Sequence, residues 1–291
     1  MTVSDFSKLI KTRLTFLVVF SASISYLIGL KEDHVLNWGE WQIWKHWFML
    51  IIGGFLVTAA ANCFNEIIEK DLDKLMKRTA DRPMPAGRMT TGQGLVLGLF
   101  MGITGTYLLG SLNLTTGYLS VFSVLLYAFA YTPLKRKSPV AVFVGAIPGA
   151  LPPLIGYVAA HGKIDEIALI LFLIQFVWQF PHFWAIAWVL DDDYKLAGFR
   201  LLPSGKRNRA SAVVTFGTTL ILLPVSLLPS IYHYGGNVVG AVSLLCSIVF
   251  LYQALTLMRT LKIEDARKLM FGSFLYLPLV QLMFLFDFIG K

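Results

Sequence analysis

The chain has 291 residues, of which 56% are hydrophobic and only 14% are charged, a composition typical of an integral membrane protein. Its length alone would allow two soluble domains, but repeated apolar runs of membrane length leave no room for them. The formal net charge of +8 does not indicate nucleic-acid binding, because the cations are distributed among the loops in the way a membrane topology requires.

Hydropathy predicts an all-α polytopic protein with nine transmembrane helices. The expected helices span residues 14–31, 45–66, 93–112, 115–133, 139–160, 166–188, 212–232, 237–258 and 269–289. The N-terminus and the loops after helices two, four, six and eight hold every Lys and Arg except Lys31, Lys45, Lys163 and Lys291. The positive-inside rule therefore places the N-terminus in the cytoplasm and, after nine crossings, the C-terminus outside.

The most informative stretch is NCFNEIIEKDLDKLMKRTADRPMPAGR, residues 62–88, which begins at the end of the second helix. Asn65, Glu69 and Asp73 follow one another at steps of four and form a polar stripe on one helix face. Such oxygen ligands suit Mg²⁺, which bridges readily to substrate phosphates. The basic residues that follow suit diphosphate oxygens; they are Lys74, Lys77, Arg78, Arg82 and Arg88. A solvated helix end with ordinary ion pairs is the alternative, but carboxylates beside a hydrocarbon-length segment favour a functional role.

The loop after the fourth helix, YTPLKRKSP, holds the adjacent cations Lys135, Arg136 and Lys137. They act either as an orientation signal or as phosphate ligands, and the sequence favours neither. In the fifth helix, Gly145 and Gly149 form a pair of small residues that predicts close approach of a neighbouring helix. The same helix has prolines that predict a break in its backbone hydrogen bonds at mid-membrane, which is tolerated only where other protein or a cavity compensates: Pro148, Pro152 and Pro153.

The sixth helix combines a polar face with an acidic end. Gln175, Gln179 and His182 lie at steps of four and three, among aromatic residues that suit a flat hydrophobic substrate. His182 either faces that substrate or satisfies the backbone carbonyl that Pro181 leaves free. At the cytoplasmic edge follow Asp191, Asp192, Asp193, Tyr194 and Lys195. Because three adjacent acids cannot all point one way on a helix, at most two are expected to face a site.

Two acidic patches thus end two helices on the cytoplasmic side, each with basic residues around it. This arrangement suits ionisation of a prenyl diphosphate, in which Mg²⁺ and Lys or Arg neutralise the charge that develops on the diphosphate. The allylic carbocation that remains requires shielding from water by apolar and aromatic walls.

Three segments resemble the UbiA-type intramembrane prenyltransferase superfamily, and within it the family of protohaem IX farnesyltransferases. They are NEIIEKDLDKLMKRTADRPMPAGR, YTPLKRKSP with GAIPGALPPLIGY, and WQFPHFWAIAWVLDDDYKLAGFRLLP, about two thirds of the chain. The family's Asn-x3-Asp-x3-Asp motif corresponds to the Asn65 stripe, with Glu69 in the middle place. Two positions depart from the pattern: the usual second Asp-x3-Asp has Val189 at its first place, and the usual Asn before Arg-Pro is Asp81.

The resemblance implies a single intramembrane prenyltransferase domain over residues 1–291, with its helices around a central cavity open to lipid. Farnesyl diphosphate, protohaem IX and water are implied to give haem O and diphosphate, with the active site toward the cytoplasm at the cell inner membrane. A haem A synthase acting downstream is a candidate partner, and no nucleic acid is expected. The implied Mg²⁺ ligands are Asn65, Glu69 and Asp73, with a second ion at Asp192 or Asp193. The implied catalytic residues are Lys77, Arg78, Arg82, Lys135, Tyr194 and Lys195, and His182 is implied to position or ligate haem.

Three alternatives to this function remain from the sequence. A prenyltransferase for a quinone precursor or another aromatic acceptor would share the diphosphate site, although PHFW with His182 favours haem. A secondary transporter would use the broken fifth helix and the polar second helix as a midplane site, but here the carboxylates cluster at one membrane face. A non-catalytic haem carrier would need His182 but not the Asn65 stripe.

Overall fold

The computed structural model describes residues 2–290, and within that range it is built of helices with no β-strand. The described part contains nine helices long and apolar enough to cross a membrane, as predicted. The chain is therefore a multi-pass membrane protein. The crossing elements are α2 (Thr12–Glu32), α3 (Trp41–Asp73), α4 (Thr91–Gly110), α5 (Leu114–Leu125) with η1 (Leu126–Tyr131) and α6 (Thr132–Leu134), α7 (Ala141–His161), α8 (Glu166–Val189), α10 (Arg209–Ser226) with α11 (Leu228–Ile231), α12 (Asn237–Thr260) and α13 (Ile263–Phe286).

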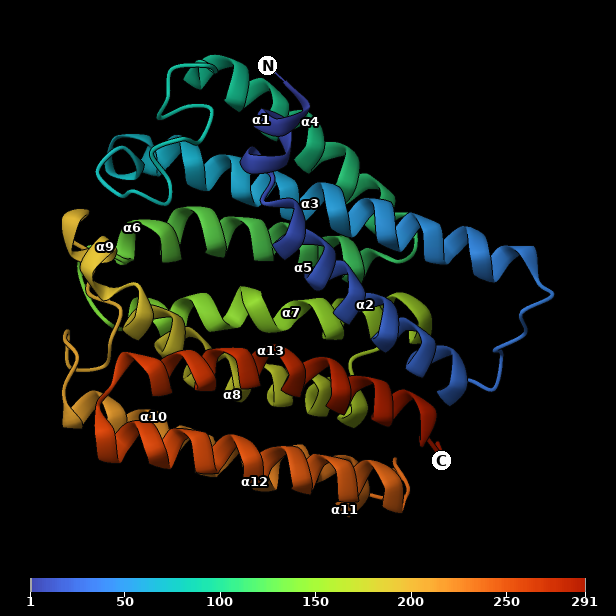
Figure 1. The fold of residues 1–291 in the computed structure, drawn as a ribbon. Coiled ribbons are helices and arrows are strands. Elements are labelled where there is room, and N and C mark those ends of the chain that lie inside the picture. The colour runs from blue at the N-terminus through green and yellow to red at the C-terminus, as the bar shows by residue number, and fades with distance from the viewer. Residues whose placement is uncertain (1, 291) are drawn as a thin grey trace.

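Two short helices lie outside the crossings: α1 (Val3–Leu9) and α9 (Asp191–Leu196). Consecutive long helices pack as neighbours, while α2 crosses the bundle to contact α3, α7 and α13 (Figure 1). Helix α6, helix α9 and the loop after α3 lie at one end of the bundle, and the connection from α2 to α3 lies at the other (Figure 1). The segments predicted to form the site are thus gathered at one end.

Helix α3 is longer than predicted at both ends, running from Trp41 to Asp73 instead of 45–66. Its 33 residues extend about 50 Å, well beyond the thickness of the hydrocarbon core. Hydropathy ends the helix at the first carboxylates, but these carboxylates are buried against partners and the helix continues through them. Similarly, α13 begins at Ile263 and not at 269, because acidic residues in a first turn favour a helix start.

The prolines of the fifth helix interrupt its backbone hydrogen bonds, as predicted, but the helix does not unwind, and α7 is continuous from Ala141 to His161. Pro153 cannot donate a backbone hydrogen bond to the carbonyl of Gly149. The Gln175 side chain of α8 replaces that donor, with Nε2 2.7 Å from the Gly149 oxygen. Gln175 Oε1 in turn accepts hydrogen bonds from Ser21 and Gln281, so a satisfied polar network joins α2, α7, α8 and α13.

The glycines of α7 create space for different kinds of neighbour. A Cβ atom at Gly149 would lie 2.0 Å from Oε1 of Gln179, so the space beside it holds a side chain and not a helix backbone. The close backbone approach is at Gly156, where a Cβ atom would lie 1.9 Å from the carbonyl oxygen of Ala22 in α2. This contact fixes how tightly α2 packs on α7.

Candidate active site

The polar stripe of α3 is the centre of the candidate site. Asn65, Glu69 and Asp73 share one buried helix face, with residue exposures of 1%, 3% and 1%. Asn65 Nδ2 donates to Glu69 Oε2 at 2.8 Å and to Thr132 Oγ1 at 3.1 Å. Buried carboxylates need cations or other charge compensation. Each member of the stripe accordingly contacts one cation, and the three cations come from three different segments.

Lys11 is the cation beside Asn65, with its Nζ 2.8 Å from Oδ1. It forms the junction of α1 and α2 in a left-handed conformation, φ 50° and ψ 56°. This conformation is costly for a residue other than glycine and is common at functional sites. Burial lowers the pKa of Lys11 well below its usual value, and neighbouring Arg82 and Lys135 act in the same direction. An anionic ligand near Lys11 would relieve this penalty.

Lys135 is the cation beside Glu69. Its Nζ lies 2.6 Å from Oε1 and 2.7 Å from Oε2 of that carboxylate. Burial lowers the pKa of Lys135, while Glu69 opposes the shift. Lys135 follows η1, a π-helical turn of a kind frequent at functional sites, and its ammonium also lies over the rings of Tyr131 and Phe199. Of the three adjacent cations in this loop, Lys135 is buried, and Arg136 and Lys137 are exposed.

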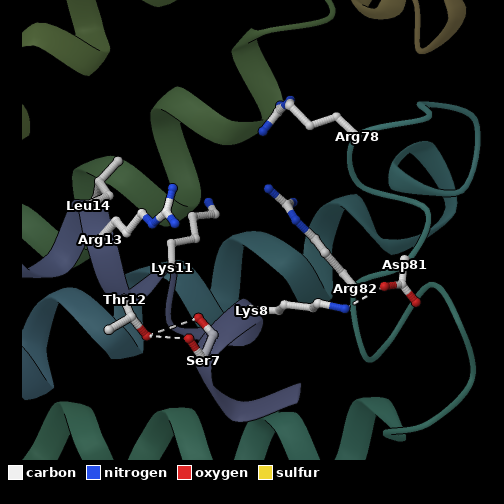
Figure 2. A pocket seen from close by; sticks show the side chains of 9 residues that line it. All are labelled: Ser7, Lys8, Lys11, Thr12, Arg13, Leu14, Arg78, Asp81 and Arg82. Atoms are coloured by element: carbon white, nitrogen blue, oxygen red, sulfur yellow. Dashed lines mark hydrogen bonds and ion pairs between the residues drawn. The ribbon is translucent and has the colours of Figure 1, made fainter. Parts of the chain in front are cut away.

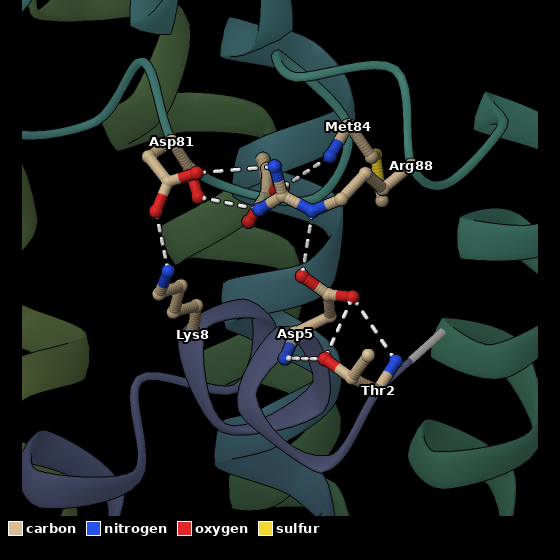
Figure 3. A network of polar contacts seen from close by, with 7 residues as sticks. Thr2, Asp5, Lys8, Asp81, Met84 and Arg88 are labelled. Carbon is tan, nitrogen blue, oxygen red and sulfur yellow. Dashed lines mark hydrogen bonds and ion pairs between the residues drawn. The ribbon is translucent and has the colours of Figure 1, made fainter.

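Arg82 is the cation beside Asp73, with Nη1 2.5 Å from Oδ2. The loop that carries Arg82 is held on α3 by Glu66, whose Oε1 accepts a hydrogen bond from the backbone N–H of Met84. The anchoring polar contacts on the other side of the loop come from α1 (Figure 3). In this network Arg88 binds Asp5 and Asp81, and Lys8 also binds Asp81.

The N-terminal segment and the loop after α3 border an open cavity of about 460 Å³ whose lining is strongly basic. The charged ends of Lys11, Arg78 and Arg82 point toward one another across it (Figure 2). Its lining residues are Ser7, Lys8, Lys11, Thr12, Arg13, Leu14, Arg78, Asp81 and Arg82. A pocket with five cations and one carboxylate is suited to a multiply charged anion.

The second acidic patch is only partly directed at this pocket. Asp193 Oδ1 accepts from the backbone N–H of Lys77 at 2.9 Å, which joins α9 to the loop after α3. The Tyr194 ring lies under the guanidinium of Arg78, 5.9 Å away, and burial raises the pKa of Tyr194. Asp192 is 76% exposed and its ion pair is with Arg207. Lys195 forms its ion pair with Asp191 of its own helix. Tyr194 therefore contacts Arg78 of the pocket lining and Asp193 binds the loop after α3, whereas Asp192 and Lys195 pair with residues outside that lining.

The donor atoms of both patches fit Mg²⁺ as it is usually bound in enzymes. Asp73 Oδ1 and Asp193 Oδ2 are buried and have no hydrogen-bond partner within residues 2–290. The same residues contain no cluster of three or more His, Cys, Asp or Glu side chains that would enclose an ion by themselves. Mg²⁺ is ordinarily held by one or two carboxylates together with water and substrate phosphates, so these two carboxylate oxygens are of the kind that could hold it.

His182 lies on α8, deeper in the bundle. Its Nδ1 is 2.7 Å from Ser273 Oγ of α13, and its ring stacks on Trp178 with centroids 4.3 Å apart. Among the described residues, its ring forms no hydrogen bond to the carbonyl that Pro181 leaves free. Gln175 and Gln179 of the same face bind backbone carbonyls of α7, at Gly149 and Ala146. These two glutamines therefore serve helix packing.

Sequence reasoning missed the contribution of the N-terminus, whose cations were counted only as an orientation signal. Lys8, Lys11 and Arg13 line the basic cavity. The available signal was the position of Lys11 just before the first membrane helix, at the depth where the stripe of α3 ends. Thr132 and Ser273 were also missed, because neither belongs to a recognisable pattern.

Known proteins include relatives that match this chain over nearly its full length. The sequence profile of the UbiA prenyltransferase family matches residues 19–277. A protoheme IX farnesyltransferase of Cytophaga hutchinsonii is 44% identical over 96% of both chains, and one of Christiangramia forsetii is 40% identical over 98% of this chain and 93% of its own.

Solved structures of low sequence identity share the fold. A structure described for digeranylgeranylglyceryl phosphate synthase in membranes superposes with a TM-score of 0.79 at 20% identity and covers 98% of both chains. A UbiA homologue from Archaeoglobus fulgidus, bound to GPP and Mg²⁺, superposes with a TM-score of 0.68 at 11% identity over 96% of this chain and 99% of its own.

Proposed function

Because the chain belongs to the UbiA prenyltransferase family, with protoheme IX farnesyltransferases among its relatives, we propose that it transfers the farnesyl group of farnesyl diphosphate to protohaem IX. The observation that carries this proposal is the buried stripe of Asn65, Glu69 and Asp73 with one cation on each member, beside a basic cavity. The farnesyl carbon joins a haem vinyl group, water adds a hydroxyl to the other vinyl carbon, and diphosphate leaves.

In this proposal the stripe binds the metal ion, and the cations of the cavity bind the diphosphate. Asp73 and Glu69, with Asn65, would hold Mg²⁺ on the substrate phosphates, and Asp193 would hold a second ion. When bound, Mg²⁺ supplies charge neutralisation for the leaving diphosphate. Arg82, Lys135 and Lys11 donate to phosphate oxygens and exchange their carboxylate or amide partners for the anion. Arg78 lines the cavity, and Lys77 precedes it in the same loop, so both are proposed to add positive charge.

Binding at this depth also protects the reactive carbon. The phosphates remain at the polar end of α3, and the isoprenoid chain extends into the apolar bundle. Tyr131, Tyr194 and Phe199 already face cations of the site, so their rings are placed to stabilise a carbocation through cation–π contact. Water is limited there by the surrounding apolar helices, which favours capture of the carbocation by the acceptor.

Protohaem is the favoured acceptor over an aromatic quinone precursor because His182 lies among aromatic rings, below the diphosphate end of the site. A transporter is disfavoured because α7 is continuous and supplies no unwound binding segment. We place residues 1–291 in one domain, in the cell inner membrane, with the N-terminus and site toward the cytoplasm. A haem A synthase is the partner expected to receive the product.

An acceptor comparison tests the proposal. Purified protein with farnesyl diphosphate and Mg²⁺ is expected to release diphosphate when protohaem IX is supplied, and to release little with 4-hydroxybenzoate as a quinone precursor. Glu69→Gln is the matched negative control, since it keeps side-chain size while removing the charge between Asn65 and Lys135. Release that depends on the aromatic acid and not on protohaem would assign the chain to quinone synthesis instead.

A further inference from the structure

A short chain of hydrogen bonds connects α8 to α13 next to His182. Ser273 of α13 is completely buried, and its Oγ lies 2.6 Å from the carbonyl oxygen of Met270 and 2.7 Å from His182 Nδ1. The backbone oxygen of the same serine accepts a hydrogen bond of 3.0 Å from Trp178 Nε1. One residue of α13 thus binds two aromatic side chains of α8.

These distances determine which ring nitrogen of His182 carries the proton. A carbonyl oxygen can only accept, so the single hydroxyl hydrogen of Ser273 must point toward Met270. The Ser273 oxygen therefore acts as acceptor toward His182, and Nδ1 must be the protonated nitrogen. In the neutral imidazole Nε2 is then left with its lone pair. No hydrogen bond to Nε2 is found within residues 2–290.

The orientation of the ring is fixed as well as its tautomer. His182 stacks on Trp178 with an interplanar angle of 17°, and Phe183 and Phe274 approach it edge-on. Trp178 is itself held by its bond to Ser273. Rotation of the imidazole would break the bond to Ser273 and the stacking together.

We propose that Ser273 is a positioning residue for the haem substrate, and that it holds His182 so that the Nε2 lone pair binds the haem iron. The inference rests on the proposed function, because it takes protohaem as the acceptor. Histidines that ligate metals commonly donate the other ring N–H to an oxygen, which fixes their tautomer and raises their basicity. His182 lies two turns before the end of α8 at Val189, about 10 Å along the axis. Iron held at that depth leaves the porphyrin edge free to approach the diphosphate end of the site.

A purely structural role predicts different behaviour. If the bond merely joined α8 to α13, its loss would lower thermal stability and weaken the binding of both substrates. If Ser273 positions His182, its loss changes the ligation of haem and leaves the diphosphate site intact, because that site is built from α3, the N-terminus and the loop after α3.

Titration of the full-length protein in detergent with ferric protohaem distinguishes these roles, with absorption and electron paramagnetic resonance spectra as readouts. The variants are Ser273→Ala and His182→Ala, and the matched control is Ser247→Ala. Ser247 is a buried serine of α12 that bonds Ser226 and Tyr276, and within residues 2–290 it forms no hydrogen bond to Trp178 or His182. It reports the cost of removing a buried hydroxyl elsewhere in the bundle.

Wild type and Ser247→Ala are expected to give the same histidine-ligated spectrum, which His182→Ala lacks. Ser273→Ala is expected to bind haem about 10- to 100-fold more weakly with an altered spectrum, while its affinity for farnesyl diphosphate matches the control.

An unchanged spectrum and haem affinity in Ser273→Ala would overturn the inference, and so would parallel losses of stability and of both affinities. A wild type that makes product without histidine ligation also overturns it and leaves the proposed function standing. A wild type that binds haem through His182 but transfers no farnesyl contradicts the proposed function instead.

Discussion

Asp73 has one carboxylate oxygen bound to Arg82 and another that is buried and has no hydrogen-bond partner among the described residues, 2–290. The unpartnered oxygen is the one available to a divalent ion. Asp73→Asn keeps the shape and removes the charge, so turnover is expected to fall by at least about 100-fold in a folded, inserted protein. Steady-state assays with saturating Mg²⁺ and farnesyl diphosphate measure this loss.

Asp71→Asn provides the matched control for that variant. Asp71 is an exposed acid of the same helix whose ion pair is with Lys74, so its loss is expected to leave turnover unchanged. Equal effects of the two substitutions would remove Asp73 from the metal site and would indicate a general effect of charge at this helix end.

A second prediction concerns which divalent metal ion supports the reaction. Chelation of divalent metal is expected to stop diphosphate release, and Mg²⁺ is expected to restore it better than Ca²⁺ does. The physical reason is that Mg²⁺ imposes a compact octahedral arrangement on diphosphate oxygens, whereas Ca²⁺ binds more loosely with more ligands. Full turnover in excess chelator would exclude a metal-assisted ionisation.

Single residues were predictable where periodicity governed them. Steps of four placed Asn65, Glu69 and Asp73 on one face, and the structure shows that this face is buried. Their cation partners were only partly predictable, because Lys11 comes from a segment 54 positions earlier in the chain. Asp192 was an expected ligand that instead binds Arg207 at the surface, since the start of a new helix at Asp191 turns it outward.

At the scale of elements, the packing of α2 on α7 depends on Gly156. A Cβ atom there would overlap the Ala22 carbonyl oxygen, which is backbone and cannot move aside cheaply. Gly156→Ala is expected to lower stability by about 1–3 kcal/mol or more, measured by thermal unfolding in detergent. Gly217→Ala is the control, because no atom of a neighbouring described residue lies within 4 Å of its added methyl group. Its effect is expected to stay within about 1 kcal/mol. Similar melting temperatures for both variants would show that the helices are not in close contact at Gly156.

Helix α1 is expected to undock from the loop after α3 at acidic pH. Hydrogen bonds from Thr2 and from Arg88 lower the pKa of Asp5, and the Lys8 side chain lowers the pKa of Asp81. Carboxyls with depressed pKa values stabilise the docked state above their ordinary pKa, and this contribution is lost as the pH falls below about 4. A spin label at Ser4, in a background without the native cysteines, is expected to become mobile in that range.

The Arg88→Ala variant supplies the comparison for the α1 measurement. It removes the shared partner of Asp5 and Asp81, so the label is expected to be mobile at neutral pH as well. A label that is equally immobile in both proteins down to pH 3 would show that α1 is held by its apolar contacts, such as buried Leu9 and Ile10, and not by its ion pairs.

Element boundaries were predicted well where apolar runs ended in loops, and poorly where helices continued through charged residues. Hydropathy alone ended α3 seven residues early, because it treats buried carboxylates as solvated. The continuity of α7 was also not predictable, since the side chain that compensates Pro153 belongs to another helix. Sequence reasoning had required such compensation, but it could not identify Gln175 as the donor.

For the whole molecule, nine crossings and the distribution of cations predict opposite sides for the two ends of the chain. A cysteine introduced at Lys137 is expected to react with an impermeant maleimide only from the cytoplasmic side. One introduced at Gly39, in the connection from α2 to α3, is expected to react only from the outside. Labelling of both positions from one side would contradict the topology and the proposed cytoplasmic site.

The central claim is that farnesyl diphosphate ionises at the Asn65 stripe and protohaem captures the carbocation. The most direct test incubates the purified protein with protohaem IX, farnesyl diphosphate and Mg²⁺ and identifies the pigment by mass spectrometry. The account predicts a product whose mass equals that of protohaem plus one farnesyl group and one hydroxyl, absent with Asp73→Asn. Unmodified protohaem, together with farnesyl transfer to another acceptor in the same preparation, would contradict it.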